Sequence, residues 1–219
     1  GTFAGMLACA KERWGVESLA RRHVTVQGVG AVGYHLVAHV VKDGGRVTVC
    51  DISDENLKRV TKDFRVEVVA PEAIFDVEAD VFAPCALGGV INDDTLGRLK
   101  VEVVAGSANN VLEDEDAHGA ALHEQGILYA PDYVINAGGL INVANELEGY
   151  NQERAFKQAE GIYDILVGVF EIAQEQGVPT REAADNLARK RIGEIAKGKS
   201  FYTSSSAAGG SERRLRGVC

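Results

Sequence analysis

Short apolar runs rich in valine alternate with amphipathic helical patterns over most of the chain. Six of these runs have the length and the β-branched content typical of strands: 23–27, 46–50, 66–69, 79–85, 101–107 and 126–131. Strands of this kind, separated by helices, predict a parallel sheet with both faces covered. Since two successive units of three strands form a dinucleotide-binding fold, we expect an α/β protein with a doubly wound, mostly parallel Rossmann sheet.

The helical patterns fall into two groups. Those between the strands cover 2–15, the segment after Gly30, 54–64 with Asp54 as its cap, 92–99 and 113–125. Additional C-terminal helices follow the sheet, a long one over 152–176 and a last one over 181–196 capped by Thr180. We therefore divide the chain into a Rossmann domain (1–150), helices that pack on it (151–197) and a mobile tail rich in Ser, Gly and Arg (198–219).

Composition narrows the class of protein. A chain of 219 residues, 46% of them hydrophobic, can bury the core of one large domain. Its net charge of -9 repels phosphate backbones, which argues against a nucleic-acid partner. No apolar run reaches the roughly 18–20 residues that cross a bilayer, so we expect no membrane association.

The cysteines and histidines give no sign of a disulfide framework or a metal site. The four cysteines lie far apart with no CxxC pair, so we expect buried thiols in a reduced cytoplasm. His35 and His39 have the i, i+4 spacing that can hold a metal on a helix, but no acidic or thiol third ligand accompanies them. We therefore expect no bound metal.

The stretch "VTVQGVGAVGYHL", residues 24–36, carries the first specific chemistry. Its three glycines follow a predicted strand and open a predicted helix. Gly28 would allow a tight turn, Gly30 would let the backbone approach a pyrophosphate, and Gly33 would let the helix pack closely on the sheet. The start of the helix would supply N–H groups and partial positive charge for the phosphates.

Asp51 ends the next predicted strand, 18 residues beyond Gly33 and near the usual spacing of about 20. Its carboxylate would accept hydrogen bonds from the adenosine ribose and repel a 2′-phosphate, which favours NAD over NADP. No arginine adjoins Asp51, although Lys58 and Arg59 follow at a short distance. The alternative is a purely structural glycine turn beside an aspartate that caps a helix.

Three later motifs carry a resemblance to a known family. "VFAPCALGGVIN", "VVAGSANN" and "YAPDYVINAGGLINVANELEGYN" resemble the cofactor-binding half of the glutamate/leucine/phenylalanine/valine dehydrogenase superfamily, and most closely its leucine dehydrogenases. The similarity runs from about Gly1 to Lys197, and "APDYVINAGG" is a specific signature. It implies reversible oxidative deamination of an L-amino acid to a 2-oxo acid, with NAD as the hydride acceptor.

The resemblance also implies site residues. It places at the cofactor Gly28, Val29, Gly30, Ala31, Val32, Gly33, Asp51, Ile52, Cys85, Ala86, Leu87, Asn109 and Asn136. Each of these segments follows a strand, as expected where ligands bind beyond the carboxyl ends of a parallel sheet. An asparagine offers both a donor and an acceptor, which suits a carboxamide or a carboxylate. The alternative is that Asn109, Asn110 and Asn136 only cap turns.

On the substrate side, the resemblance implies a pocket formed by Asn136, Leu140 and Val143 for a branched aliphatic side chain. Many leucine dehydrogenases carry valine where this chain has Leu140. The larger residue would shrink the pocket by about one methylene, worth roughly 1–3 kcal/mol, and favour leucine, isoleucine and valine over phenylalanine. The alternative is that Leu140 and Val143 pack in the core.

The family's catalytic lysine, in a "GGGK" motif, and its catalytic aspartate lie in an N-terminal domain. This sequence has no GGGK. We therefore expect the cofactor-binding half of such an enzyme, which has no catalytic residue and is inactive alone. We expect the full-length parent protein to form homo-oligomers. We also expect the apolar face of 155–170 to be partly exposed. The alternatives are a phenylalanine or valine dehydrogenase, or a non-catalytic nucleotide-binding module.

Overall fold

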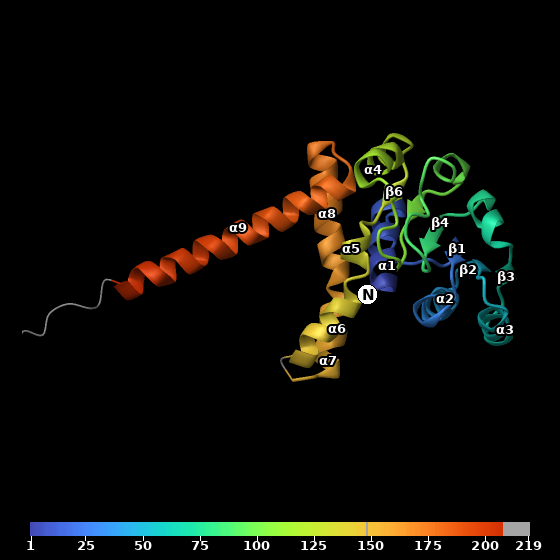
Figure 1. Cartoon of the computed structure of the whole chain (residues 1–219), viewed down its shortest axis with the longest axis horizontal. Coiled ribbons are helices and arrows are strands. Elements are labelled where there is room, and N and C mark those ends of the chain that lie inside the picture. The colour runs from blue at the N-terminus through green and yellow to red at the C-terminus, as the bar shows by residue number, and fades with distance from the viewer. Residues whose placement is uncertain (148, 208–219) are drawn as a thin grey trace, which may run out of the picture. The chain divides into compact units, whose positions relative to one another are not determined.

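The computed structural model describes residues 1–147 and 149–207 and contains a six-stranded parallel sheet (Figure 1). Its strand order is β3-β2-β1-β4-β5-β6, and every neighbouring pair is parallel. This confirms the predicted Rossmann sheet. The strands are β1 (His23–Gln27), β2 (Arg46–Cys50), β3 (Glu67–Val68), β4 (Val81–Pro84), β5 (Val103–Val104) and β6 (Leu128–Tyr129).

The order of the strands determines where a ligand can bind. β1 pairs with β2 on one side and with β4 on the other. The strands β2 and β3 therefore extend the sheet on one side of β1, and β4, β5 and β6 extend it on the other. In open α/β sheets, ligands usually bind beyond the carboxyl ends of the strands at such a change of direction, so the loops after β1 and β4 are the place to look for a site.

Helices connect the strands. They are α1 (Thr2–Trp14), α2 (Ala31–Asp43), α3 (Asp54–Asp63), α4 (Glu115–Glu124) and the short 3-10 helices η1 (Pro71–Asp76) and η2 (Leu96–Arg98). In the orientation of Figure 1, α2 and α3 lie below the strands and α4 lies above them. α1 and α2 end at Gly15 and Gly44, whose left-handed backbone (φ 74° and 94°) suits glycine at a helix C-terminus.

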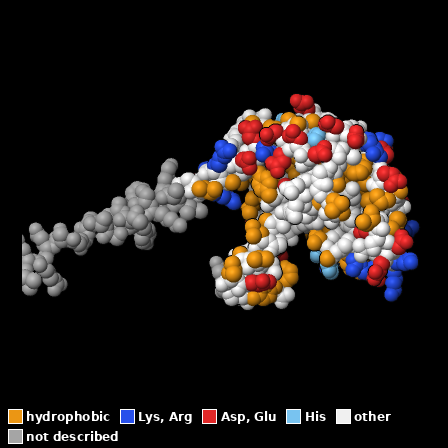
Figure 2. Space-filling view, in the orientation of Figure 1, with side chains coloured by type: hydrophobic (Ala, Val, Ile, Leu, Met, Phe, Trp, Pro, Cys, Tyr) orange, Lys and Arg blue, Asp and Glu red, His pale blue; other side chains and the backbone are white. Residues whose placement is uncertain are grey.

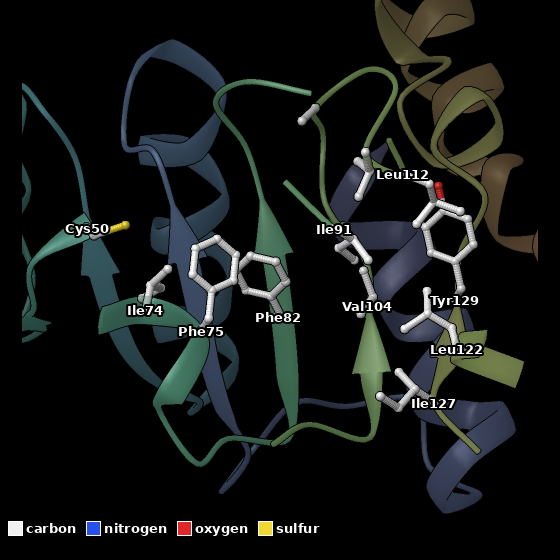
Figure 3. Close-up of a cluster of buried hydrophobic side chains, with 12 residues drawn as sticks. Cys50, Ile74, Phe75, Phe82, Ile91, Val104, Leu112, Leu122, Ile127 and Tyr129 are labelled. Carbon is white, nitrogen blue, oxygen red and sulfur yellow. The ribbon is translucent and has the colours of Figure 1, made fainter. Parts of the chain in front are cut away.

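The core lies between the sheet and these helices. The central strands are buried on both faces, with Val24, Val26 and Val49 on one face and Thr25 and Thr48 on the other. A cluster of buried side chains runs along one face of the sheet, where Phe75 of η1 and Phe82 of β4 meet with ring centroids 5.5 Å apart (Figure 3). The sheet is thus a rigid support for the loops at its carboxyl end.

The segment after β6 is helical: α5 (Asp132–Ile135), α6 (Gly138–Leu147), α7 (Gln152–Glu160), α8 (Ile162–Gln176) and α9 (Thr180–Ala207). A compact unit spans Gly1–Ala184, and a second unit begins at Asp185. Our division of the sheet from the later helices at residue 150 stays a prediction. Among the described residues, no helix is both long enough and apolar enough to cross a membrane.

Several local predictions were wrong. The helix expected over 152–176 is interrupted at Gly161, which separates α7 from α8, and α8 packs against α1 and α5. In that packing Ile162, Leu166, Val169 and Phe170 are buried, while Ala159 and Ile165, on the face expected to be partly exposed, are half-buried. The helix expected over 92–99 shrinks to the single turn η2, since the side chain of Asn92 caps a turn there instead.

Helix caps also differ from the prediction. Ser53, not Asp54, caps α3, and its hydroxyl accepts from the N–H of Asn56 at 3.3 Å. Thr180 is the first residue of α9 and does not cap it; its hydroxyl donates to the carbonyl of Tyr129 at 2.6 Å and so joins α9 to β6. α9 continues to Ala207, through ten residues of the expected tail, while 208–219 lie outside the described residues.

Candidate functional site

The glycine turn lies between β1 and α2 at the carboxyl end of the sheet. Gly28 has φ +91°, which a residue with a side chain rarely adopts. Its N–H donates to the carbonyl of Cys50 at 2.8 Å, and a Cβ at this position would lie 2.6 Å from the Cβ of Ala86. The turn is therefore enclosed by the ends of β2 and β4, and only glycine fits.

The other two glycines serve different purposes. A Cβ on Gly33 would overlap the carbonyl oxygen of Gly28, so glycine lets the first turn of α2 lie directly on the loop. A Cβ on Gly30 would meet nothing within 4 Å. Gly30 is the N-cap of α2 and offers no side chain to bond the first N–H groups of the helix. No side chain caps the start of α2, so its first N–H groups can serve a phosphate.

Within the turn, Val29 and the two residues after Gly30 are placed differently. The side chain of Val29 is fully buried, and its N–H and carbonyl are both bonded inside the protein. Val29 therefore shapes the turn instead of offering polar groups to a ligand. Ala31 and Val32 are exposed on the first turn of α2, where they can contact a ligand directly.

Asp51 follows β2 and joins the turn to α3. Its Oδ2 accepts the N–H of Val29 at 2.7 Å and the amide of Asn56 at 3.2 Å, and its Oδ1 accepts the N–H of Ser53 at 2.8 Å. A carboxylate has about four lone-pair positions, so Oδ1 keeps an acceptor position for a ligand. Ile52 beside it is 92% exposed, an apolar surface next to the carboxylate.

Arg59 of α3 is a site residue that the sequence did not identify. Its Nη2 donates to the carbonyls of Val29 at 3.1 Å and Gly30 at 3.3 Å, and the guanidinium lies over the ring of Tyr34 at 4.3 Å. Sequence spacing alone places Arg59 eight residues after Asp51 and gives no sign of this contact. The helix turns the side chain back onto the glycine loop.

The loop after β4 forms the opposite wall. The N–H of Cys85 donates to the carbonyl of Gln27 at 2.8 Å, which extends the pairing of β1 and β4 by one residue. Ala86 and Leu87 are exposed, Leu87 by 76%. Burial raises the pKa of the Cys85 thiol, and hydrogen bonds with Ser107 oppose that change in part. The thiol is therefore protonated near neutral pH and serves as a wall residue.

A cavity of about 700 Å³ opens beside this wall, between the ends of β5 and β6 and the start of α6. It is lined by Val32, Asn109, Asn136 and Leu140 of the predicted site, and also by Asp132 and Tyr133, which the prediction omitted although the "APDY" motif contains them. Figure 2 shows the hollow between α2 and the α6–α7 pair. Val143 does not line this cavity and is 53% exposed on α6.

Two asparagines meet in the cavity. Asn136 donates from Nδ2 to the Oδ1 of Asn109 at 2.6 Å and to the carbonyl of Ala108 at 3.3 Å. This uses both N–H bonds of Asn136, so its Oδ1 remains as an acceptor, and Nδ2 of Asn109 remains as a donor. Asn110 beside them has a left-handed backbone (φ +50°), which asparagine tolerates better than most residues. The pair therefore presents one acceptor and one donor side by side.

The acids at the cavity are already bonded. Asp132 accepts the N–H groups of Val111 at 3.1 Å and Tyr133 at 2.8 Å, and Glu115 pairs with Arg181 at 2.9 Å. Among the residues that line the cavity, none is a lysine or a histidine. Within the described part of the chain, no group of three or more His, Cys, Asp or Glu residues could hold a metal.

Comparisons with known proteins show what the chain is similar to. Residues 47–199 match the model of the family described as glutamate/leucine/phenylalanine/valine dehydrogenase. A leucine dehydrogenase from Thermoactinomyces intermedius is 54% identical over 202 residues, which cover 92% of this chain and 55% of that protein. The chain thus spans about half the length of this curated relative.

Two solved structures extend the comparison. The crystal structure of L-tryptophan dehydrogenase from Nostoc punctiforme matches with a TM-score of 0.86 and 47% identity, covering 88% of this chain and 58% of that one. A hetero-hexameric glutamate dehydrogenase from Thermus thermophilus, in a leucine-bound form, matches with a TM-score of 0.67 and 26% identity, covering 88% of this chain and 52% of that one. These relatives act on different amino acids by name, so the comparisons do not choose a substrate.

Proposed function

Because the chain belongs to the glutamate/leucine/phenylalanine/valine dehydrogenase family, we propose that it is the NAD-binding portion of an enzyme that deaminates a branched-chain L-amino acid, leucine first, to its 2-oxo acid. The single observation that carries the proposal is the glycine turn. In this turn, Gly28 has a left-handed backbone, and a Cβ on Gly30 would meet no protein atom within 4 Å. The carboxylate of Asp51 accepts the N–H of Val29 in the same turn.

The residues present fit a nicotinamide dinucleotide. The uncapped start of α2 would take the pyrophosphate, and the open space at Gly30 is where a side chain would otherwise obstruct it. The remaining acceptor position on Asp51 would take a ribose hydroxyl. When bound, the cofactor would supply the hydride acceptor, and these residues of the chain would bind and orient it.

The asparagine pair supports the placement of the other end of the cofactor and of the substrate. A primary carboxamide carries one acceptor and one donor group, which match the free Nδ2 of Asn109 and the free Oδ1 of Asn136. Leu140 lines the same cavity with 74% of its surface exposed, so it can contact a substrate side chain. Val143 is exposed on the same helix and extends this apolar surface.

We propose that the reaction needs groups beyond this chain. The acids of the cavity are engaged in hydrogen bonds or an ion pair, and the cavity lining offers no lysine or histidine as a base. The chain covers 55% of the leucine dehydrogenase relative, and the remainder of such a protein would supply the catalytic groups and close the site from water. Homo-oligomers are expected of the parent protein.

A chimaera tests this proposal. The part of the Thermoactinomyces intermedius enzyme that has no counterpart in this chain would be joined ahead of Gly1, and NADH formation would be followed with leucine, valine, phenylalanine and tryptophan. We expect activity that is highest with the branched aliphatic substrates. As a matched control, Asn136→Ala in the chimaera should lower activity without unfolding it. Activity with phenylalanine or tryptophan above that with leucine would contradict the substrate proposal.

A further inference from the structure

The guanidinium of Arg59 and the carboxylate of Asp51 hold the same residue from two sides. Asp51 accepts the N–H of Val29 at 2.7 Å, and Arg59 donates to the carbonyl of Val29 at 3.1 Å. The N and O atoms of one residue are separated by only three bonds, so both charged groups lie close to each other at the glycine turn. Among the described residues, they form no ion pair with each other.

Arg59 is held in this position by its surroundings. Its guanidinium lies 4.3 Å above the ring of Tyr34, a favourable cation–π geometry. The hydroxyl of Tyr34 donates to the carboxylate of Asp63, one turn further along the same helix as Arg59, at 2.7 Å. Asp63 therefore orients the ring and not the guanidinium. The side chain of Arg59 is fixed by the turn below it and the aromatic ring beside it.

The charge of Arg59 is still available to a ligand. Both bonds to the turn come from Nη2 and end on neutral carbonyls, which do not cancel the positive charge. No described residue accepts from Nε or Nη1. One N–H bond on Nε and two on Nη1 therefore remain as donors for phosphate oxygens, on a group that keeps its full positive charge. Arg59 is also exposed, so a ligand can reach it.

We propose that Arg59 is a specificity-determining residue poised to bind the 2′-phosphate of NADP(H), and that the carboxylate of Asp51 is what keeps that phosphate away. This inference rests on the proposed NAD site. A 2′-phosphate brings close to two negative charges beside Asp51, and repulsion by the carboxylate opposes the attraction of Arg59. Removing the carboxylate leaves Arg59 as an existing phosphate receptor, so a single substitution should admit NADPH.

The test measures Kd for NADH and NADPH by cofactor fluorescence in four variants of the full chain: Asp51→Ser, Arg59→Met, Asp51→Ser/Arg59→Met and Asp51→Ser/Arg59→Lys. Serine keeps an oxygen that can accept the N–H of Val29. Arg65→Met in the Asp51→Ser background is the matched control, because Arg65 is an exposed arginine just beyond α3 that makes none of the contacts of Arg59. Circular dichroism checks that each variant is folded.

We expect Asp51→Ser to bind NADPH at least about 10-fold more tightly than the wild type does, Arg59→Met to cancel that gain in the double variant, and Arg59→Lys to restore part of it. The gain should also shrink at high salt. Arg65→Met should leave it in place. If folded Asp51→Ser/Arg59→Met binds NADPH as tightly as Asp51→Ser, or if Asp51→Ser gains nothing, the inference is wrong. Failure of the wild type to bind NADH would instead refute the proposed function itself.

Discussion

Two alanine substitutions in the glycine turn separate folding from cofactor binding. Gly28 and Gly30 are two residues apart, yet their surroundings differ. At Gly28 the backbone is left-handed (φ +91°) and a new methyl would lie 2.6 Å from the Cβ of Ala86. At Gly30 the backbone has φ −64° and a new methyl would meet no protein atom within 4 Å. The first methyl collides with the protein and the second projects only into the proposed pyrophosphate site.

The magnitudes follow from these surroundings. Gly28→Ala combines backbone strain of about 1–3 kcal/mol with an overlap that costs about 1–3 kcal/mol, so we expect a loss of roughly 2–6 kcal/mol in the free energy of unfolding. Gly30→Ala changes only the residue at a helix N-cap, so its cost should be about 1 kcal/mol or less. Its methyl should nevertheless raise Kd for NADH at least about 10-fold, because the backbone N–H groups can no longer approach the phosphates.

Urea unfolding and NADH fluorescence titration measure the two effects on the same samples. Gly97→Ala is the control, since Gly97 is an exposed glycine of η2, remote from the turn, whose Cβ would also meet nothing within 4 Å. It should change neither quantity appreciably. If Gly30→Ala binds NADH as tightly as the wild type, the pyrophosphate does not lie at Gly30 and the reasoning fails.

Three further predictions concern the core, a buried histidine and the asparagine pair. Phe82→Ala should lower the free energy of unfolding by about 3–5 kcal/mol in urea titrations, because Phe82 is fully buried; a loss under about 1 kcal/mol would contradict this packing. Burial and Arg46 lower the pKa of His23, so the unfolded chain binds the proton more readily and stability falls as pH drops below about 6.5. His23→Asn should therefore flatten the change in unfolding free energy between pH 7.5 and pH 5.5, and a slope equal to that of the wild type would refute the assignment. Asn136→Ala should raise Kd for NADH about 5-fold with little loss of stability, since one acceptor that faces the cavity is removed; unchanged NADH binding would place the carboxamide elsewhere.

The sheet could be predicted from sequence because its signal is local. Each strand is a short valine-rich run, a pattern that predicts burial on both faces of the sheet. The structure shows this burial in β1, where Val24 and Val26 are buried on one face and Thr25 on the other. The geometry of Gly28 was also predictable, because the motif demands a backbone that only glycine adopts readily.

The structural features that could not be predicted from the sequence depend on contacts between residues far apart along the chain. Helical periodicity continues across Gly161, so the interruption of the helix at that residue could not be predicted from the pattern. The sequence predicts that the hydroxyl of Thr180 caps a helix. In the structure this hydroxyl donates to the carbonyl of Tyr129 in β6, an acceptor that only the fold brings near. The sequence pattern makes Arg59 an ordinary residue of a polar helix. Its contacts with the glycine turn and with Tyr34 exist only because α2 and α3 lie side by side in the fold.

The central claim is that the glycine turn and Asp51 form a site for NAD(H), and calorimetric titration of the purified chain with NADH and NADPH tests it most directly. The account predicts saturable binding of one NADH per chain and at least about 10-fold weaker binding of NADPH, because Asp51, which is bonded to the turn, would accept a ribose hydroxyl and would repel a 2′-phosphate. No saturable binding of NADH, or equal affinity for the two cofactors, would contradict it.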